Sequence, residues 1–91
     1  MVRQIVETLR RHGVLRAGIF GSFARGEADE TSDVDLLIDP PPEMSLFGLA
    51  RLGNELEAAL DHNVDLITCR SLHPRFREAV LKEQVSILGL L

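Results

Sequence analysis

Two aspartates, Asp33 and Asp35, have the residue type and spacing that chemistry at phosphate requires. They stand at the start of the apolar run Val34 to Ile38, which predicts a strand, and alternate residues of a strand leave the same face. Two carboxylates held so close repel each other unless a cation joins them. Oxygen ligands completed by substrate phosphates are what Mg²⁺ takes in proteins. The pair therefore predicts a site for a metal-bound polyphosphate.

A third carboxylate, Asp65, lies in a second short apolar run, Val64 to Thr68. In a strand, Val64 and Leu66 would point to one face and Asp65 to the other. A charge in the middle of such a strand needs a partner. A cation shared with the other aspartates, in a two-metal arrangement for displacement at phosphorus, would supply one. A salt bridge to an arginine is the alternative.

A glycine-containing turn precedes the paired aspartates. The apolar run Ala17 to Phe20 predicts a buried strand, and Gly21 and Ser22 then open a helical segment of little more than one turn. Gly21 lets the backbone approach phosphates closely, and the amides from Ser22 onward favour an anion. Arg25 would pair with a phosphate or lock the loop to a nearby carboxylate.

Three longer helices are predicted from apolar residues that recur every three or four positions. In the first, which ends near Gly13, they are Val2, Ile5, Val6 and Leu9. In the second, which Ser45 would cap, they are Leu49, Leu52, Leu56 and Leu60. In the third, which begins at Pro74, they are Phe76, Ala79 and Val80.

The polar residues between these positions are expected on the surface. His12 is expected as a solvated residue of the first helix's last turn. In the second helix, the residues expected to face outward are Arg51, Asn54, Glu55 and Glu57. His62 and His73 fall in loops and receive no catalytic role.

The strands are expected to form one mixed sheet. The short connection between the first two strands favours antiparallel neighbours, and residues 36–38 are apolar on both faces, which places the second strand at the centre. Val85 to Leu88 predicts a closing strand. The fold class is therefore α/β (α+β), with a mixed sheet of about four strands and helices packed mainly on one side.

The pattern Gly21-Ser22-x-x-Arg25-Gly26, followed by Ser32-Asp33-x-Asp35-Leu36, resembles the signature of the DNA polymerase β-like nucleotidyltransferase superfamily. The short chain is similar to its minimal nucleotidyltransferase (MNT) branch, with residues 1–91 as one domain. The resemblance covers nearly the whole chain. It implies the polymerase β-like nucleotidyltransferase fold and transfer of a nucleoside monophosphate to an acceptor hydroxyl with divalent metal.

The resemblance also implies roles and a partner. Asp33 and Asp35 would hold Mg²⁺ on ATP, and Asp65 would hold a second ion and help to deprotonate the hydroxyl. Gly21 and Ser22 would grip the outer phosphates, and Arg25 would fix the loop or neutralise phosphate charge. MNT proteins pair with a helical HEPN-domain ribonuclease toxin. The MNT member acts as antitoxin, in a type VII-like pair, by adding AMP to a toxin tyrosine.

Two alternatives stay open. The chain would be a non-catalytic antitoxin if complex formation alone neutralised the partner. It would be a small-molecule (aminoglycoside-type) nucleotidyltransferase if a partner subunit supplied the acceptor site. Larger superfamily members carry an acceptor-binding domain for which 91 residues leave no room, so we expect another macromolecule to present the hydroxyl.

Composition and charge indicate which ligands and which cellular compartment are expected for this chain. The net charge is −4 and there is no run of Lys or Arg, so direct nucleic-acid binding is not expected. A single cysteine, Cys69, suits a reducing compartment, and no signal or membrane span is recognisable, so a cytoplasmic protein is expected. Arg70, Arg75 and Arg77 form a basic cluster, either a solvated face or a contact for ATP or a partner. The leucine stripes on several predicted helices are compatible with self-association or with a helix face that a partner covers.

Overall fold

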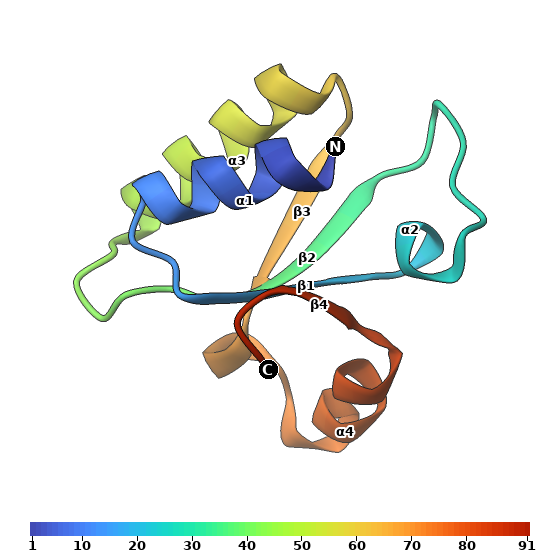
Figure 1. The fold of residues 1–91 in the computed structure, drawn as a ribbon. Coiled ribbons are helices and arrows are strands. Elements are labelled where there is room, and N and C mark those ends of the chain that lie inside the picture. The colour runs from blue at the N-terminus through green and yellow to red at the C-terminus, as the bar shows by residue number, and fades with distance from the viewer.

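A four-stranded mixed sheet runs through the computed structural model, which describes all 91 residues (Figure 1). The elements in chain order are α1 (Val2–Arg11), β1 (Arg16–Phe20), α2 (Ser22–Arg25), β2 (Val34–Asp39), α3 (Leu46–Leu60), β3 (Val64–Thr68), the 3₁₀ helix η1 (Cys69–Ser71), α4 (Pro74–Glu83) and β4 (Val85–Leu88). The strand order is β3-β2-β1-β4. β1 is antiparallel to β2 and β4, and β2 is parallel to β3. The predicted fold class and the central place of β2 are therefore confirmed.

One face of the sheet carries the main hydrophobic core. α1 and α3 lie side by side over this face (Figure 1). They contribute Ile5, Leu9, Leu52, Leu56 and Leu60, and the strands beneath contribute Ala17, Ile19, Val34, Leu36 and Ile38. Because strand residues alternate, Asp35 and Leu37 point to the opposite face. The core therefore fixes which side of the sheet receives the aspartates.

The second helix begins where its sequence predicts. The Ser45 side chain accepts a hydrogen bond from the Gly48 amide at 3.2 Å, which satisfies one of the free amides of the first turn of α3. Asp61 ends the helix in the left-handed conformation, with φ of 55°. The short turn that follows leads directly into β3.

His12 and two glutamates do not lie as predicted. His12 is not a solvated end residue: its side chain is 16% exposed, and its Nε2 lies 3.1 Å from Glu55 Oε2. Glu55 therefore faces α1, and the Glu57 carboxylate accepts a hydrogen bond from the Val64 amide at 3.0 Å. The prediction that these side chains face outward was wrong, because the packing of α3 against α1 and β3 brings polar partners that the helical period does not reveal.

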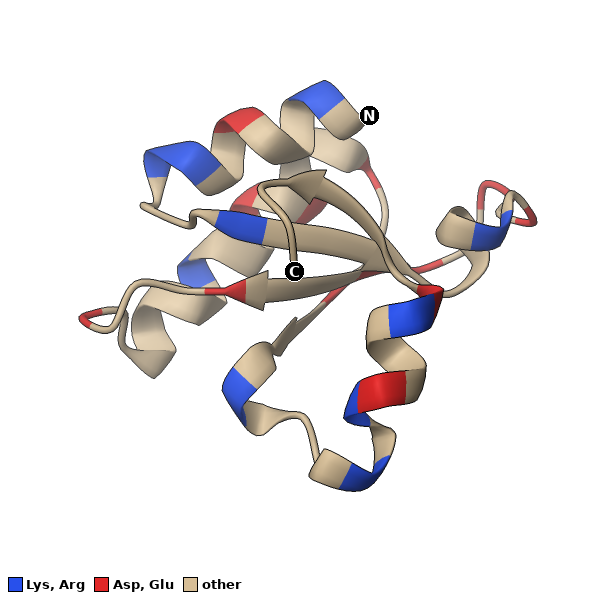
Figure 2. Cartoon of the chain, turned by 60° about the horizontal axis from the view of Figure 1, so that its bottom comes forward, with Lys and Arg blue, Asp and Glu red and all other residues tan.

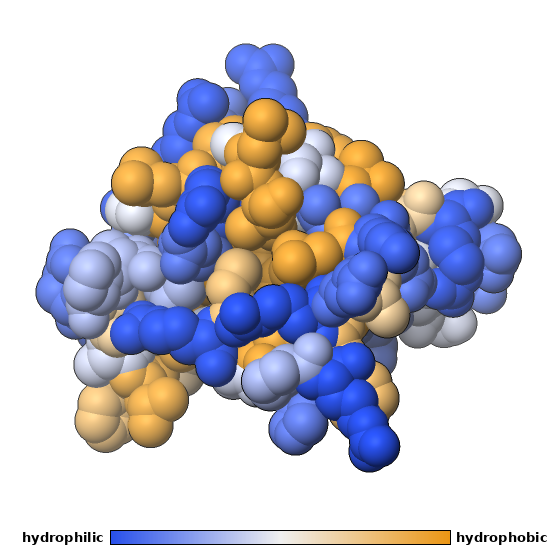
Figure 3. All heavy atoms as spheres, turned by 90° about the horizontal axis from the view of Figure 1, so that it is seen from below, coloured by the Kyte–Doolittle hydropathy of each residue, from blue (hydrophilic) through white to orange (hydrophobic).

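The opposite face of the sheet is covered more thinly. α4 lies below it and has no buried residue, and Phe76, a predicted apolar-face residue, is 59% exposed (Figure 1). Seen from below, apolar side chains form a patch in the middle of this face, with charged side chains around and across it (Figure 3). A hollow of about 250 Å³ here is lined by Arg16, Leu37, Cys69, Arg70, Leu72, Arg77, Leu81 and Leu91.

The basic cluster and the cysteine belong to this thinly covered face. Arg70, Arg75 and Arg77 are exposed, and the Arg77 guanidinium donates to the Cys69 carbonyl at 3.3 Å. Partial burial raises the pKa of the Cys69 thiol, which fits an unreactive packing role. None of the helices is long and apolar enough to cross a membrane.

Candidate active site

The parallel pairing of β2 with β3 brings two of the predicted carboxylates together. Asp35 and Asp65 are direct partners in the register. Their neighbours in the same register, Val34 with Val64 and Leu36 with Leu66, point toward the core, so both aspartates leave the other face. Asp33 lies two residues before Asp35, exposed at the start of β2. Figure 2 shows the acidic stretches of the strands at the end of the sheet beside α2.

These carboxylates repel one another, and none of them is in an ion pair. Burial raises the pKa of the Asp35 carboxyl, and the charges of Asp65 and Asp33 raise it further, while the charge of Arg25 offsets part of this rise. None of the ion pairs in the structure involves any of the three aspartates. The alternative of a salt bridge from Asp65 to an arginine is therefore not what the structure forms. A partly buried carboxylate whose pKa is raised by like charges is typical of functional sites.

The turn after β1 faces Asp35. Gly21 has φ of 73° and ψ of −150°, a conformation almost restricted to glycine. A Cβ atom at this position would collide with Oδ2 of Asp35. The single turn of α2 then runs from Ser22 to Arg25, and Gly26 ends it in the left-handed conformation. Since the first amides of a helix have no acceptor within the helix, the amides that follow Gly21 are free to donate to a ligand.

Comparison with known proteins decides the family of this chain. The family profile described as nucleotidyltransferase domain matches residues 2–87. The chain belongs to the nucleotidyltransferase-domain family.

Two curated relatives refine this assignment. A protein from Methanocaldococcus jannaschii, provisionally named a protein adenylyltransferase, is 46% identical over 86 residues, which is 94% of this chain and 92% of that protein. The protein adenylyltransferase MntA from Thermococcus cleftensis is 43% identical over 81 residues, which is 89% of this chain and 82% of that protein. The chain is thus an enzyme of the nucleotidyltransferase class.

Solved structures agree with this assignment. One that is provisionally described as a minimal nucleotidyltransferase matches with a TM-score of 0.83 and 43% identity, over 92% of this chain and 86% of that one. A toxin–antitoxin with AMP-PNP matches with a TM-score of 0.85 and 24% identity, over 97% of this chain and 73% of that one. A tri-AMPylated Shewanella oneidensis HEPN toxin in complex with MNT antitoxin matches with a TM-score of 0.76 and 22% identity, over 97% and 69%. The last two likenesses are evidence for the fold alone.

In this nucleotidyltransferase Arg25 forms contacts within the protein. Its Nη1 donates to Glu83 Oε1 at 2.7 Å, and its Nε lies 3.4 Å from Glu27 Oε2. These are contacts with nearby carboxylates, as one of the two predicted roles requires, and pairing with a phosphate stays a prediction. The bond joins α2 to the end of α4, and Glu83 is also one of the charges that raise the pKa of Asp35.

The nucleotidyltransferase carboxylates fit a magnesium ion. No three acidic, histidine or cysteine side chains converge closely enough to hold a metal ion by themselves. Mg²⁺, however, commonly takes only one or two protein carboxylates and completes its shell with phosphate oxygens and water. The like charges around Asp35 and the absence of a side chain at Gly21 both suit a cation held between the strand and a polyphosphate.

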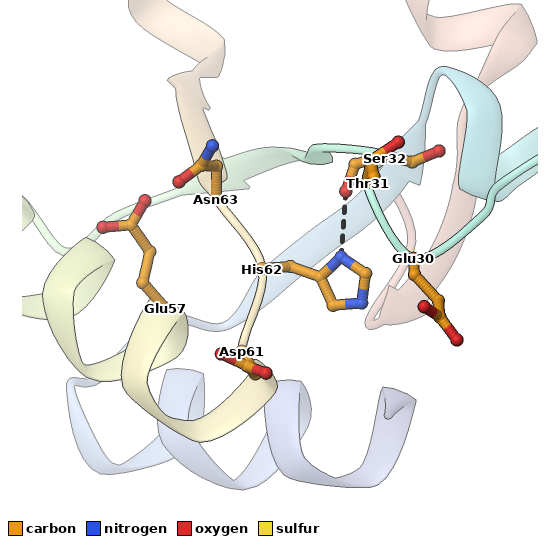
Figure 4. Close-up of a pocket in the computed structure, with 7 residues that line it drawn as sticks. All are labelled: Glu30, Thr31, Ser32, Glu57, Asp61, His62 and Asn63. Carbon is orange, nitrogen blue, oxygen red and sulfur yellow. Dashed lines mark hydrogen bonds between the residues drawn. The ribbon is translucent and has the colours of Figure 1, made fainter.

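A polar hollow of about 450 Å³ lies between the loop that leads into Asp33 and the turn after α3 (Figure 4). Its lining residues are Glu30, Thr31, Ser32, Glu57, Asp61, His62 and Asn63. The sequence placed His62 in a loop, as the structure does, but did not reveal its contact with the segment that carries Asp33. In the structure its Nδ1 lies 2.9 Å from the Ser32 carbonyl oxygen, beside Asp33. Its only signal in the sequence is its position three residues before Asp65.

Proposed function

We propose that this chain is a magnesium-dependent protein adenylyltransferase that transfers AMP from ATP to a tyrosine hydroxyl of a HEPN-domain toxin, and that it acts as the antitoxin of that toxin. The observation that carries the proposal is the register of Asp35 with Asp65, next to Asp33 and opposite Gly21. The names of the curated relatives support the adenylyl transfer. The Shewanella oneidensis complex supports a HEPN partner, and the complex with AMP-PNP supports ATP.

Each side chain has a defined task in this reaction. Asp33 and Asp35 would hold Mg²⁺ against the triphosphate, and Asp65 would hold a second ion. These ions supply charge neutralisation at the phosphoryl oxygens. The amides and hydroxyl of the turn at Gly21 and Ser22 bind the outer phosphates and orient the triphosphate for in-line attack.

The bond changes follow from this placement. The acceptor oxygen forms a bond to the α-phosphorus, and the bond from that phosphorus to the bridging oxygen of the β-phosphate breaks. Pyrophosphate leaves with the electron pair of the broken bond. Asp65, on the open face of β3, accepts the proton of the attacking hydroxyl. The protein therefore contributes position and charge more than covalent chemistry, as is general for transfer at phosphorus.

Transfer of label from α-labelled ATP tests this function. The purified chain, Mg²⁺ and the protein encoded beside it are incubated, and the label on that partner is measured. We expect label on the partner with the wild type, and a loss of more than about a hundredfold with Asp33→Asn combined with Asp35→Asn, because the charge at the transition state is then uncompensated. Asp39→Asn, at the other end of the same strand, is the matched control and should retain transfer.

The same experiment separates catalysis from binding. If no label is transferred, while the complex forms and the partner is silenced by wild type and double variant alike, the adenylyl transfer is refuted. The chain is then a binding antitoxin. If label goes to a small hydroxyl compound and not to the partner, the protein acceptor is refuted instead.

A further inference from the structure

His62 lies in the turn between α3 and β3 and contacts two other segments of the site. Its Nδ1 is 2.9 Å from the Ser32 carbonyl oxygen, and Figure 4 shows the ring turned toward that residue. A carbonyl only accepts hydrogen bonds, so Nδ1 carries the proton and donates it. The ring also meets Phe23 of α2 edge-on, with 5.5 Å between the ring centroids and an angle of 86° between the planes.

The next residue holds the other side of Asp33. The Val34 amide donates to the Asn63 carbonyl at 2.8 Å. Residues 62 and 63 therefore fix the backbone immediately before and immediately after Asp33. Asp33 itself is exposed, and its side chain is in no ion pair, so these two bonds do much to set where its carboxylate lies.

We propose that His62 is a positioning residue for this nucleotidyltransferase, which acts through the Ser32 carbonyl to fix Asp33 relative to the turn that begins at Gly21. Two parts of the site meet at its ring, the backbone before Asp33 and the α2 turn through Phe23, and the chain continues from His62 into β3, which carries Asp65. The proposal rests on the proposed function for its catalytic consequence. Partners that orient metal ligands typically change metal affinity or activity by about 10- to 100-fold when they are removed.

Two substitutions separate the hydrogen bond from the packing of the ring. His62→Asn keeps an N–H donor close to the position of Nδ1 and loses the ring, whereas His62→Phe keeps the ring against Phe23 and loses the donor. We expect His62→Phe to raise the Mg²⁺ concentration for half-maximal transfer by about 10- to 100-fold, and His62→Asn to restore most of it. A merely structural role would lower the plateau of transfer through loss of folded protein, but not this half-saturating concentration.

The measurements extend beyond activity. Calorimetry with MgATP should show the same order of affinities, with the wild type and His62→Asn above His62→Phe. Amide exchange of Val34, which donates to the Asn63 carbonyl, should be faster without nucleotide in His62→Phe than in the wild type. Glu30→Ala, which alters the same hollow without touching the Ser32 carbonyl, is the matched control and should behave as the wild type.

The outcomes are distinct. Wild-type Mg²⁺ dependence and MgATP affinity in His62→Phe would overturn the positioning role and leave the proposed function intact. Equal defects in His62→Phe and His62→Asn would show that the hydrogen bond is not the cause. If the wild type neither transfers label nor binds MgATP, the proposed function fails. The exchange data then decide the positioning role alone, and unchanged exchange in His62→Phe overturns it.

Discussion

At the scale of single residues, the site depends on an absent side chain as much as on those present. Gly21 combines a backbone conformation that other residues avoid with direct contact to the Asp35 carboxylate. Both constraints act on one position, because the turn must approach Asp35 closely in order to place its amides beside the carboxylates. Gly26, at the end of the same short helix, has the left-handed helical conformation and open space around it.

The substitution Gly21→Ala tests this dependence. We expect it to lower the free energy of unfolding by about 1–3 kcal/mol, which is the cost of holding a residue with a Cβ atom in such a conformation. AMP transfer should fall more than about tenfold, because the Asp35 carboxylate must move away from the new methyl group. Chemical denaturation and the label-transfer assay measure the two effects.

Gly26→Asn is the matched control for that substitution. Asparagine adopts the left-handed conformation readily, and nothing lies within 4 Å of a Cβ atom at this position. Transfer by Gly26→Asn should stay close to that of the wild type. Full activity in Gly21→Ala would show that close approach at this turn is not required.

The positions of the candidate site residues could be predicted where chemistry and local spacing coincide. The turn at Gly21 and the carboxylates of Asp33 and Asp35 follow from residue type and short separations along the chain. The partners that hold these segments could not be found in this way. His62 bonds to a residue 30 positions away and Arg25 to one 58 positions away, and no local pattern encodes such contacts.

At the scale of elements, α1 and α3 are joined by a polar contact above their apolar faces. Glu55 of α3 accepts from the His12 ring at the end of α1, and Arg11 Nη2 lies 3.5 Å from the same carboxylate. The hydrogen bond from His12, and then the positive charges nearby, lower the pKa of the Glu55 carboxyl. The ionised carboxylate is therefore bound more favourably in the folded protein than in the unfolded chain.

Because this pKa is lowered, the contribution of Glu55 to the free energy of unfolding should decrease as the pH falls. The stabilisation by Glu55 is present above the pKa of the carboxyl in the unfolded chain and is lost as the pH falls through the lower pKa of the folded protein. We expect Glu55→Gln to lower the melting temperature by a few degrees at neutral pH, and the difference from the wild type to shrink toward zero in acid. Thermal unfolding of both proteins over a pH series measures it. A difference that is constant across the series would assign the loss to packing instead of charge.

The elements themselves follow the local sequence closely. The closing strand has the predicted bounds, and Ser45 and Pro74 start their helices as expected. The full strand order β3-β2-β1-β4 was not predicted, because the sequence of a short apolar strand does not specify which strands pair with it. The burial of the predicted apolar face of α4 was misjudged for a different reason: a helical period does not show how much of that face the sheet will cover.

At the scale of the whole molecule, the two sides of the sheet are unequal. α1 and α3 bury leucines and isoleucine at full depth, whereas α4 buries none of its residues. Large apolar side chains also stay exposed elsewhere, among them Leu46 and Phe47 at 83% and 87%. Self-association, or coverage of such a surface by a partner, stays a prediction.

Unequal coverage predicts unequal local stability. Segments with few buried contacts open with smaller free energies than the global unfolding. We expect the amides of α4 to exchange with solvent at least about tenfold faster than those of α1, a helix of the same length, 10 residues, that buries Ile5 and Leu9. Hydrogen exchange followed by mass spectrometry measures both helices in one experiment. Equal protection of α1 and α4 would contradict this assignment.

The parallel register of β2 and β3 has a consequence for how the carboxylates keep their distance. Asp35 and Asp65 stand on adjacent strands, so the separation of their backbones is the interstrand spacing of any sheet, about 4.8 Å. This spacing is fixed by the backbone hydrogen bonds between the strands and not by side-chain packing. Substitutions in the hydrophobic core can therefore leave the backbone separation of Asp35 and Asp65 unchanged.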